Sequence, residues 1–272
     1  MAVLGIMLFC IIKESLPALI EIGGGLFDME REWRPLSGTP SYNILPMILA
    51  TLYVSVLAVL IAVPLGLGCA LFLCCYAKKG AARLAFAFVD LLAGVPSVIF
   101  GFLGLVVVVK FLENNLQMNS GECVLAAGVV LAVMLFPFVV SSCGESVGLA
   151  WERYAIPALA LGASKEYALR KAILPAAGRG ISAGLMLALG RAMGETMAVM
   201  MVLGNSPILP RLLGRGETIA SLTALEMGSV EYGSLHLSAI YAANLILILL
   251  LGLLYFAAYR LKRSMGEESD AR

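Results

Sequence analysis

Two ionisable side chains, Arg191 and Glu195, lie four residues apart in the otherwise apolar stretch Gly190–Met197. A charged group at the centre of a membrane span costs about 2.5–3.5 kcal/mol on insertion scales, so such groups usually face a partner or a water-filled path. Residues four apart share one face of a continuous helix. The pattern therefore predicts a helix that lines a route for a polar solute. The alternative is a buried ion pair that only locks two helices together.

The composition places this pair in a membrane. Of the 272 residues, 61% are hydrophobic and only 14% are charged, whereas soluble domains carry about 25% charged residues. Each of several long uncharged stretches can supply the roughly 20 apolar residues that cross a bilayer. These stretches are Pro35–Ala77, whose first part we expect to be an external loop, Leu91–Val109, Cys123–Gly144, Gly180–Gly190 with Thr196–Pro210, and Tyr232–Tyr259.

A sixth span is expected at the amino end. Met1–Ile12 is apolar, and Lys13 and Glu14 separate it from the apolar Ser15–Ile20. No basic residue precedes Lys13, so the segment lacks the basic start of a signal peptide. We therefore expect an all-α membrane protein with about six transmembrane helices, whose first helix is truncated or has a misassigned start.

The basic residues orient these spans, because cytoplasmic loops carry an excess of Lys and Arg. The richer set of loops holds three, five and four basic residues in Ala77–Arg83, Gly144–Gly180 and Arg260–Arg272. The poorer set holds two, none and two in Glu21–Asn43, Glu113–Gly121 and Gly204–Leu235. The distribution predicts a multi-pass protein of the plasma (inner) membrane with both termini in the cytoplasm.

The sequence gives little indication of metal binding, disulfide chemistry or ATP hydrolysis. The six cysteines form no Cys-x-x-Cys pair and no Cys/His cluster with metal spacing, and His236 is the only histidine. No Walker-type phosphate loop is present, so this chain is not expected to hydrolyse ATP. We expect no catalytic residue, no metal or cofactor site in this chain and no nucleic-acid partner.

The segment Asp90–Ser97 also departs from plain hydrophobicity. Pro96 lacks a backbone donor and is expected to kink its helix, which leaves a free carbonyl and the Ser97 hydroxyl to face a cavity. Gly101 and Gly104 permit close helix approach. Structural packing explains the same residues equally well.

The long segment Gly144–Gly180 is too large for a simple turn and is expected to lie in the cytoplasm. Gly162 is expected to break one short helix and Ser164 to cap the next, Lys165–Leu174, which Pro175 stops. An exposed apolar helix-turn-helix favours docking to a partner with a groove. The alternative is that it packs under its own membrane bundle.

These residues resemble a known family. Ala158–Ser164, followed by Arg170–Pro175, resembles the EAA loop of type I ABC importer permeases, although Ile156-Pro157-Ala158 stands where Glu-Ala-Ala is typical. Leu91–Ser97 with Gly101, and Gly190–Val199, are similar to phosphate importer permeases. The Gly-Glu-Thr-Met-Ala-Val ending is more similar to their PstC-type than to their PstA-type subunit.

The resemblance implies a permease subunit that passes inorganic phosphate and performs no bond chemistry. Its implied partners are a second, PstA-type permease, a dimer of ATPases that bind ATP and Mg, an external phosphate-binding protein and membrane lipid. The implied organisation is a first helix and external loop over 1–43, a permease domain over 44–263 with a coupling loop over 144–180, and a cytoplasmic tail over 264–272.

The resemblance and the residue chemistry together suggest two sites. The substrate pathway is expected to contain Arg191, which attracts the anion, Glu195, which tunes access or discriminates between anions, and the hydroxyls of Thr196 and Ser97. The expected ATPase contacts are Ala158, Leu161, Gly162, Ala163, Ser164, Lys165 and Glu166. Two alternatives stay open: a permease for another oxyanion, such as molybdate or sulfate, and a secondary transporter or intramembrane enzyme.

Overall fold

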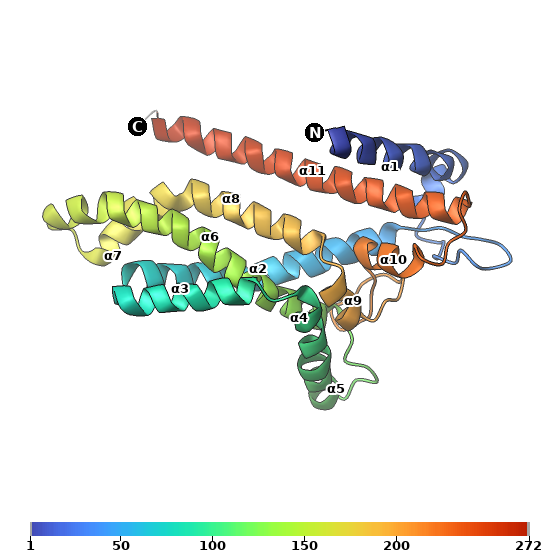
Figure 1. Cartoon of the computed structure of the whole chain (residues 1–272), viewed down its shortest axis with the longest axis horizontal. Helices are drawn as coiled ribbons and strands as arrows, with labels where there is room; N and C mark the ends of the chain where they lie inside the picture. The colour runs from blue at the N-terminus through green and yellow to red at the C-terminus, as the bar shows by residue number, and fades with distance from the viewer. Residues whose placement is uncertain (1, 271–272) are drawn as a thin grey trace. The chain divides into compact units, whose positions relative to one another are not determined.

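The computed structural model describes residues 2–270, so residues 271 and 272 of the expected tail lie outside the described residues. The described chain is helical, and its one bridge between extended segments pairs Arg34 with Ser41 (Figure 1). Helices dominate because a chain in lipid must satisfy its backbone polar groups within the segment. In chain order the elements are α1 (Ala2–Glu21), η1 (Gly23–Phe27), α2 (Leu45–Cys75), α3 (Lys79–Ala93), α4 (Ser97–Leu103), η2 (Gly104–Val109), α5 (Lys110–Leu116), α6 (Val124–Ala160), α7 (Lys165–Ala168), η3 (Leu169–Ile173), α8 (Leu174–Met193), α9 (Met197–Leu203), α10 (Ile219–Glu226) and α11 (Leu235–Asp270).

Six of the described helical segments are long and apolar enough to cross a membrane, which confirms the expected architecture. They are Ala2–Glu21, Leu45–Cys75, Ser97–Leu116, Val124–Ala160, Lys165–Met193 and Leu235–Ala257. Several boundaries differ from expectation, two of them at the sequence motifs. The span predicted at Leu91–Val109 begins only at Ser97, and the predicted Thr196–Pro210 stretch contributes only the short helix α9.

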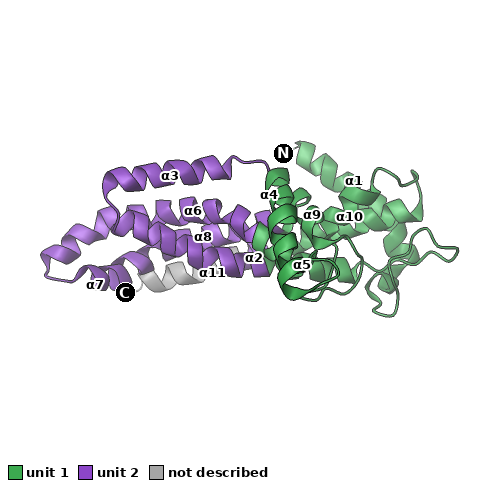
Figure 2. Cartoon of the chain, turned by 90° about the horizontal axis from the view of Figure 1, so that it is seen from below, with its two compact units in different colours: residues 1–56, 97–130, 193–253 green, residues 57–96, 131–192, 254–272 purple. Residues whose placement is uncertain are grey.

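The chain divides into two compact units (Figure 2). Unit 1 consists of Met1–Val56, Ser97–Val130 and Met193–Leu253, and unit 2 consists of Leu57–Pro96, Leu131–Ala192 and Leu254–Arg272. The chain passes between the units at five points. Two of these points lie at breaks between helices, directly after Pro96 and close to Gly194, and both breaks fall in segments that the sequence singled out.

The core of unit 1 joins the loop before α2 to α2, α10 and α11. Its apolar centre includes Leu26, Ile44 and Met47, all fully buried. Beside it, Trp33 Nε1 donates to both carboxylate oxygens of Glu226 at 3.0 and 3.1 Å, and His236 Nε2 lies 2.7 Å from Glu226 Oε2. The Trp33 ring also meets the edge of Tyr42 at 5.7 Å between centroids. These contacts tie the loop before α2 to the helices of the carboxyl half.

Unit 2 is held together by small residues. Ser142 and Ser146 of α6 lie against Gly184 and Gly180 of α8, so closely that an added β-carbon on either glycine would collide with the serine opposite. Gly144 is likewise covered by the ring of Phe86. Small residues that allow helices to approach are the usual means of helix association in lipid, where burial of apolar surface brings no gain.

One buried acid in unit 1 makes stability depend on pH. Glu217 lies in the segment that connects the last two spans, and only 4% of its surface is exposed to solvent. Burial, and secondarily the charge of Glu226, raise the pKa of the Glu217 carboxyl to about 7. Because the folded protein then holds this proton more tightly than the unfolded chain does, the stability falls as pH rises from about 4.5 to about 7.

We therefore expect Glu217→Gln to stabilise the permease by about 2–3 kcal/mol at pH 8 and to change little at pH 4.5. Thermal unfolding of the purified protein across this pH range measures the effect. Glu231→Gln, which alters an exposed acid, is the control. Parallel pH profiles for the wild type and Glu217→Gln would contradict the assignment.

Candidate functional site

The membrane motif around Pro96 forms a break between two helices. Helix α3 ends at Ala93, where the backbone N–H of Gly94 bonds back to carbonyls of the last turn, and α4 begins at Ser97. The expected kink is thus a complete interruption, because proline disfavours a helical conformation in the residue before it and lacks an N–H of its own. Ser97 opens the helical run Ser97–Leu116, at the end where the backbone N–H groups have no helical partners.

A second break separates Arg191 from Glu195, and the prediction that they share one helical face is wrong. Helix α8 ends at Met193, and α9 begins only at Met197. Glu195 Oε1 instead accepts a hydrogen bond of 3.3 Å from the backbone N–H of Ala198 in the first turn of α9. The two charged residues also belong to different compact units, Arg191 to unit 2 and Glu195 to unit 1.

Ser97 and Thr196 lie at the same end of a packed helix pair within unit 1. A β-carbon added at Gly101 of α4 would stand 2.9 Å from the Cα of Ala198 on α9, and one added at Gly104 would stand 3.1 Å from the side chain of Val202. Contacts that advance along both helices together mean that α4 and α9 run in the same direction. Their amino ends, which carry the predicted pathway hydroxyls, therefore lie side by side.

Arg191 stands at the exposed carboxyl end of α8, where the helix dipole favours a cation. Its guanidinium carbon lies 5.6 Å from the ring centroid of Phe138 on α6. The neighbouring Gly190 accommodates the hydroxyl of Tyr255 on α11. Within unit 2, Arg191 forms no ion pair with a described residue, so its charge is available to an anion.

We expect Gly101→Ala to disturb the pathway by forcing α4 and α9 apart. Its β-carbon would meet backbone at Ala198, which cannot rotate away, so we estimate a stability loss of about 1–3 kcal/mol. Gly68→Ala, where an added β-carbon meets nothing within 4 Å, is the matched control. Equal melting temperatures and equal uptake rates for the two variants would show that the close packing of α4 on α9 is unimportant.

The turn between α6 and α7 follows from two residues named in the sequence analysis. Gly162 adopts a left-handed conformation with φ of +82°. The N–H of Gly162 bonds to the carbonyl of Leu159 at 3.0 Å, and the N–H of Ala163 bonds to that of Ala158 at 3.1 Å. This is the Schellman pattern that ends a helix at glycine. Ser164 then caps α7 by accepting from the N–H of Tyr167 at 3.2 Å, as predicted.

This turn and its flanking helices carry a cavity of about 650 Å³. Five of the seven predicted ATPase contacts line it, and four further residues complete it: Ala158, Leu161, Gly162, Ala163 and Ser164, with Tyr167, Ala168, Lys171 and Ala172. Lys165 does not line the cavity, because its ammonium lies over the rings of Tyr76 and Trp151 at 4.4 and 5.3 Å. Glu166 is exposed. Sequence reasoning missed Tyr167 as a cavity residue, although its place in the amphipathic stretch three residues after the cap Ser164 pointed there.

The expectation that Pro175 stops the helix after Ser164 is wrong. The helix continues from Lys165 to Met193, and a wider π-helical turn at Leu169–Ile173 comes just before the proline. Such a turn shifts the hydrogen-bond register, so the missing N–H of Pro175 is tolerated. The segment Gly144–Gly180 is therefore two long helices joined by the short turn Leu161–Ser164.

Comparison with known proteins agrees with this architecture. Residues 62–263 match the family described as the binding-protein-dependent transport system inner membrane component. The chain is 32% identical over 219 residues to a probable ABC transporter permease protein, YqgH, of Bacillus subtilis, which covers 80% of this chain and 71% of the relative. It is 33% identical over 260 residues to the phosphate transport system permease protein PstC of Mesorhizobium japonicum, with 88% and 79% covered. It is 31% identical over 271 residues to a probable PstC of Methanocaldococcus jannaschii, with 90% and 85% covered.

The fold is also similar to that of solved transporters. An inward-facing MetNI methionine ABC transporter matches with a TM-score of 0.64 over 82% of this chain and 95% of the solved chain, at 19% sequence identity. A second crystal form of the same transporter gives a TM-score of 0.60. At this level of identity the likeness describes the fold alone.

Proposed function

We infer that this chain, which belongs to the binding-protein-dependent transport system inner membrane component family, is the PstC-type permease subunit of an ATP-driven importer of inorganic phosphate. The observation that carries the choice of substrate is the identity of 31–33% to PstC proteins over most of the chain. The chain is an integral, multi-pass membrane protein and a transport subunit, not an enzyme. It works with another permease, an ATPase and a binding protein, as its family implies.

Beyond the family, we propose a PstA-type protein as the second permease and an orientation in the plasma (inner) membrane with both termini in the cytoplasm. The excess of Lys and Arg in 77–83, 144–180 and 260–272 supports this orientation. ATP and Mg would be bound by the partner ATPase, and no cofactor by this chain. We retain the domain limits 1–43, 44–263 and 264–272, with the coupling segment at 144–180, as part of the proposal.

The coupling role rests on the turn between α6 and α7. Leu161 is 89% exposed although apolar, and the cavity beside it is lined by small residues and Tyr167. Exposed apolar surface beside a cavity is what a partner's groove or ridge would bury. We propose that the ATPase docks here, through Leu161, Gly162, Ala163 and Ser164 with Ala158 behind them. Lys165 fixes the turn to Tyr76, and Glu166 contributes a rim charge.

The pathway role rests on Arg191, Glu195, Thr196 and Ser97. A guanidinium grips an oxyanion through two parallel charge-assisted hydrogen bonds. Ser97 and Thr196 bring two hydroxyls to the same end of the α4–α9 pair, beside backbone N–H groups that begin the helical run Ser97–Leu116. We propose that these donors line the passage, and that motion of the coupling turn opens it alternately to the two sides of the membrane.

Glu195 is proposed to select the anion. Phosphate at neutral pH keeps at least one proton, which a carboxylate can accept in a hydrogen bond, whereas fully ionised sulfate would only be repelled. The test is ATP-driven uptake of labelled phosphate, sulfate and molybdate by the complete reconstituted complex. We expect phosphate to be transported at least tenfold faster than sulfate, and Glu195→Gln to narrow that ratio. Preferred uptake of sulfate or molybdate would identify a permease for another oxyanion, and an unchanged ratio in the variant would remove Glu195 from selection.

A further inference from the structure

Unit 1 also holds a cavity whose charged lining residues are mainly basic. This cavity of about 480 Å³ lies between the loop that precedes α2 and the irregular segment between α9 and α10. Its charged lining residues are Arg31, Glu32, Arg211 and Arg215, with Asn43 beside them. The charged lining thus holds three guanidinium groups and one carboxylate.

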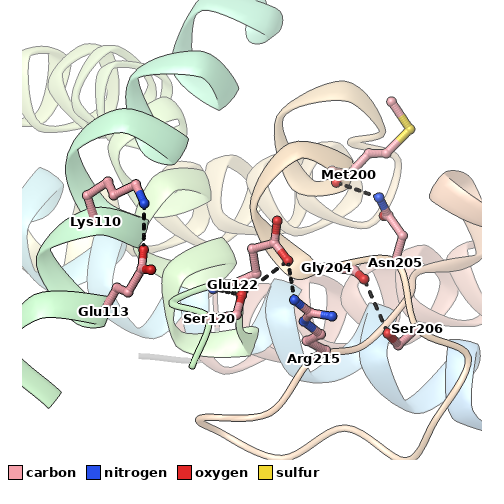
Figure 3. Close-up of polar contacts among 9 residues, drawn as sticks. All are labelled: Lys110, Glu113, Ser120, Glu122, Met200, Gly204, Asn205, Ser206 and Arg215. Carbon is pink, nitrogen blue, oxygen red and sulfur yellow. Dashed lines mark hydrogen bonds and ion pairs between the residues drawn. The ribbon is translucent and has the colours of Figure 1, made fainter. Parts of the chain in front are cut away.

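The wall that carries Arg215 is rigid. Arg215 Nη2 pairs with Glu122 Oε2 at 3.1 Å (Figure 3). The methylenes of Arg215 pack against Gly204, whose φ of +89° favours glycine, so closely that an added β-carbon would stand 2.7 Å away. Backbone bonds of 3.1 Å from Ser206 N to Gly216 O and from Gly216 N to Leu203 O close the loop. The cavity is therefore built before any ligand arrives.

The opposite wall is also ordered. Asn43, which is 2% exposed, donates from Nδ2 to the backbone carbonyl of Arg31 at 2.9 Å. The Arg31 guanidinium lies over the backbone at Gly25, and its Nε reaches Asp28 only at a long 3.4 Å. Glu32, the one acid in the lining, is paired with Arg34, which lies outside the lining. Two of the lining guanidiniums are themselves paired, Arg31 with Asp28 and Arg215 with Glu122, which leaves Arg211 as the remaining lining cation.

Arg211 is the third guanidinium group of the cavity lining. Its backbone is held in a turn by the bond from Gly214 N to Arg211 O at 2.9 Å. Its side chain is exposed and forms no ion pair or hydrogen bond with another described residue. A guanidinium beside a preformed, half-enclosed cavity is suited to a planar pair of oxyanion oxygens.

We propose that this cavity is an oxyanion-binding site, in which Arg211 holds the ligand with two hydrogen bonds and Arg31 and Arg215 contribute charge from the flanking walls. The identity of the natural ligand as phosphate rests on the proposed function. The binding chemistry itself needs only the residues of unit 1.

The test is equilibrium binding of labelled inorganic phosphate to the purified permease–ATPase complex without the binding protein. Measuring in an Arg191→Gln background removes the guanidinium of the proposed passage. We expect this complex to bind phosphate and Arg211→Gln to weaken that binding at least tenfold, the loss expected for charge-assisted hydrogen bonds. Lys110→Gln, which removes an exposed cation of α5 in the same unit but outside the cavity, should change the affinity less than twofold.

Three results would overturn the proposal: no phosphate binding in the Arg191→Gln complex at millimolar concentrations, equal losses in Arg211→Gln and Lys110→Gln, or unchanged phosphate binding in Arg211→Gln. Anion uptake measured in parallel distinguishes failure of the proposed function from failure of this binding site. A complex that binds phosphate through Arg211 but transports another anion would refute the proposed function, whereas the proposed binding site would remain supported.

Discussion

Replacing Arg191 by glutamine is expected to reduce ATP-driven phosphate uptake at least tenfold, while the assembled complex keeps its stability. The change removes the positive charge and the paired donors that grip an oxyanion, each charged hydrogen bond being worth about 1.5–3 kcal/mol. The side chain is exposed at the end of α8 and touches Phe138 through its face, so little packing is lost. Uptake by proteoliposomes that contain equal amounts of complex measures the effect.

Arg191→Lys separates charge from geometry. Lysine keeps the positive charge but not the fork of donors, so we expect uptake between that of the wild type and that of Arg191→Gln. Should the glutamine variant transport phosphate at the normal rate, Arg191 would be a packing residue that lies over Phe138, and the substrate would take a different route.

Replacing Leu161 by aspartate is expected to abolish both co-purification of the ATPase and uptake. The leucine is 89% exposed at the tip of the turn between α6 and α7. A carboxylate placed in an interface that buries this position would lose its hydration without gaining a partner, a cost of several kcal/mol. The amount of ATPase retained on the affinity-purified permease, together with stimulated ATP hydrolysis, measures the loss.

The matched control is Leu36→Asp. Leu36 is 92% exposed as well, but it lies in the loop before α2 rather than at the coupling turn. It should retain the ATPase in full. Equal retention in both variants would mean that the turn at Leu161 does not dock on the ATPase.

Local residue chemistry was enough to predict the coupling turn. The conformation of Gly162 and the cap supplied by Ser164 depend only on neighbouring backbone, and the structure has both as expected. Length and hydropathy were likewise enough for the six spans. The rule that proline ends a helix failed at Pro175. A π-helical turn over Leu169–Ile173 shifts the hydrogen-bond register before the proline, so the helix continues through it.

The membrane site was predicted only in part, because its geometry depends on tertiary packing. The sequence indicated that Pro96 and the stretch around Arg191 are unusual. It did not reveal that the helix ends at Met193, so Arg191 and Glu195 were predicted to share one continuous helix. What orders this region is the approach of α4 to α9 through Gly101, between segments about a hundred residues apart in sequence. No local pattern encodes which helix a glycine will meet.

The contacts of the loop before α2 were also beyond prediction. Trp33 and Glu226 are separated by 193 positions, yet the indole bonds both carboxylate oxygens. Arg211 looked like one of two basic residues in an outer loop and counted only toward orientation. Its lack of an ion-pair partner becomes meaningful once the structure sets it beside the cavity that Arg31 and Arg215 also line.

The central claim is that the position of Arg191 lies along a water-filled passage that the ATPase opens and closes. Its most direct test introduces Arg191→Cys into a variant lacking the native cysteines and measures the reaction with a membrane-impermeant thiol reagent during ATP turnover. Ala188→Cys, at a fully buried position one turn earlier on α8, is the control. The account predicts rapid labelling at position 191 and little labelling at 188. No labelling at 191 in the resting or the ATP-driven complex would contradict it.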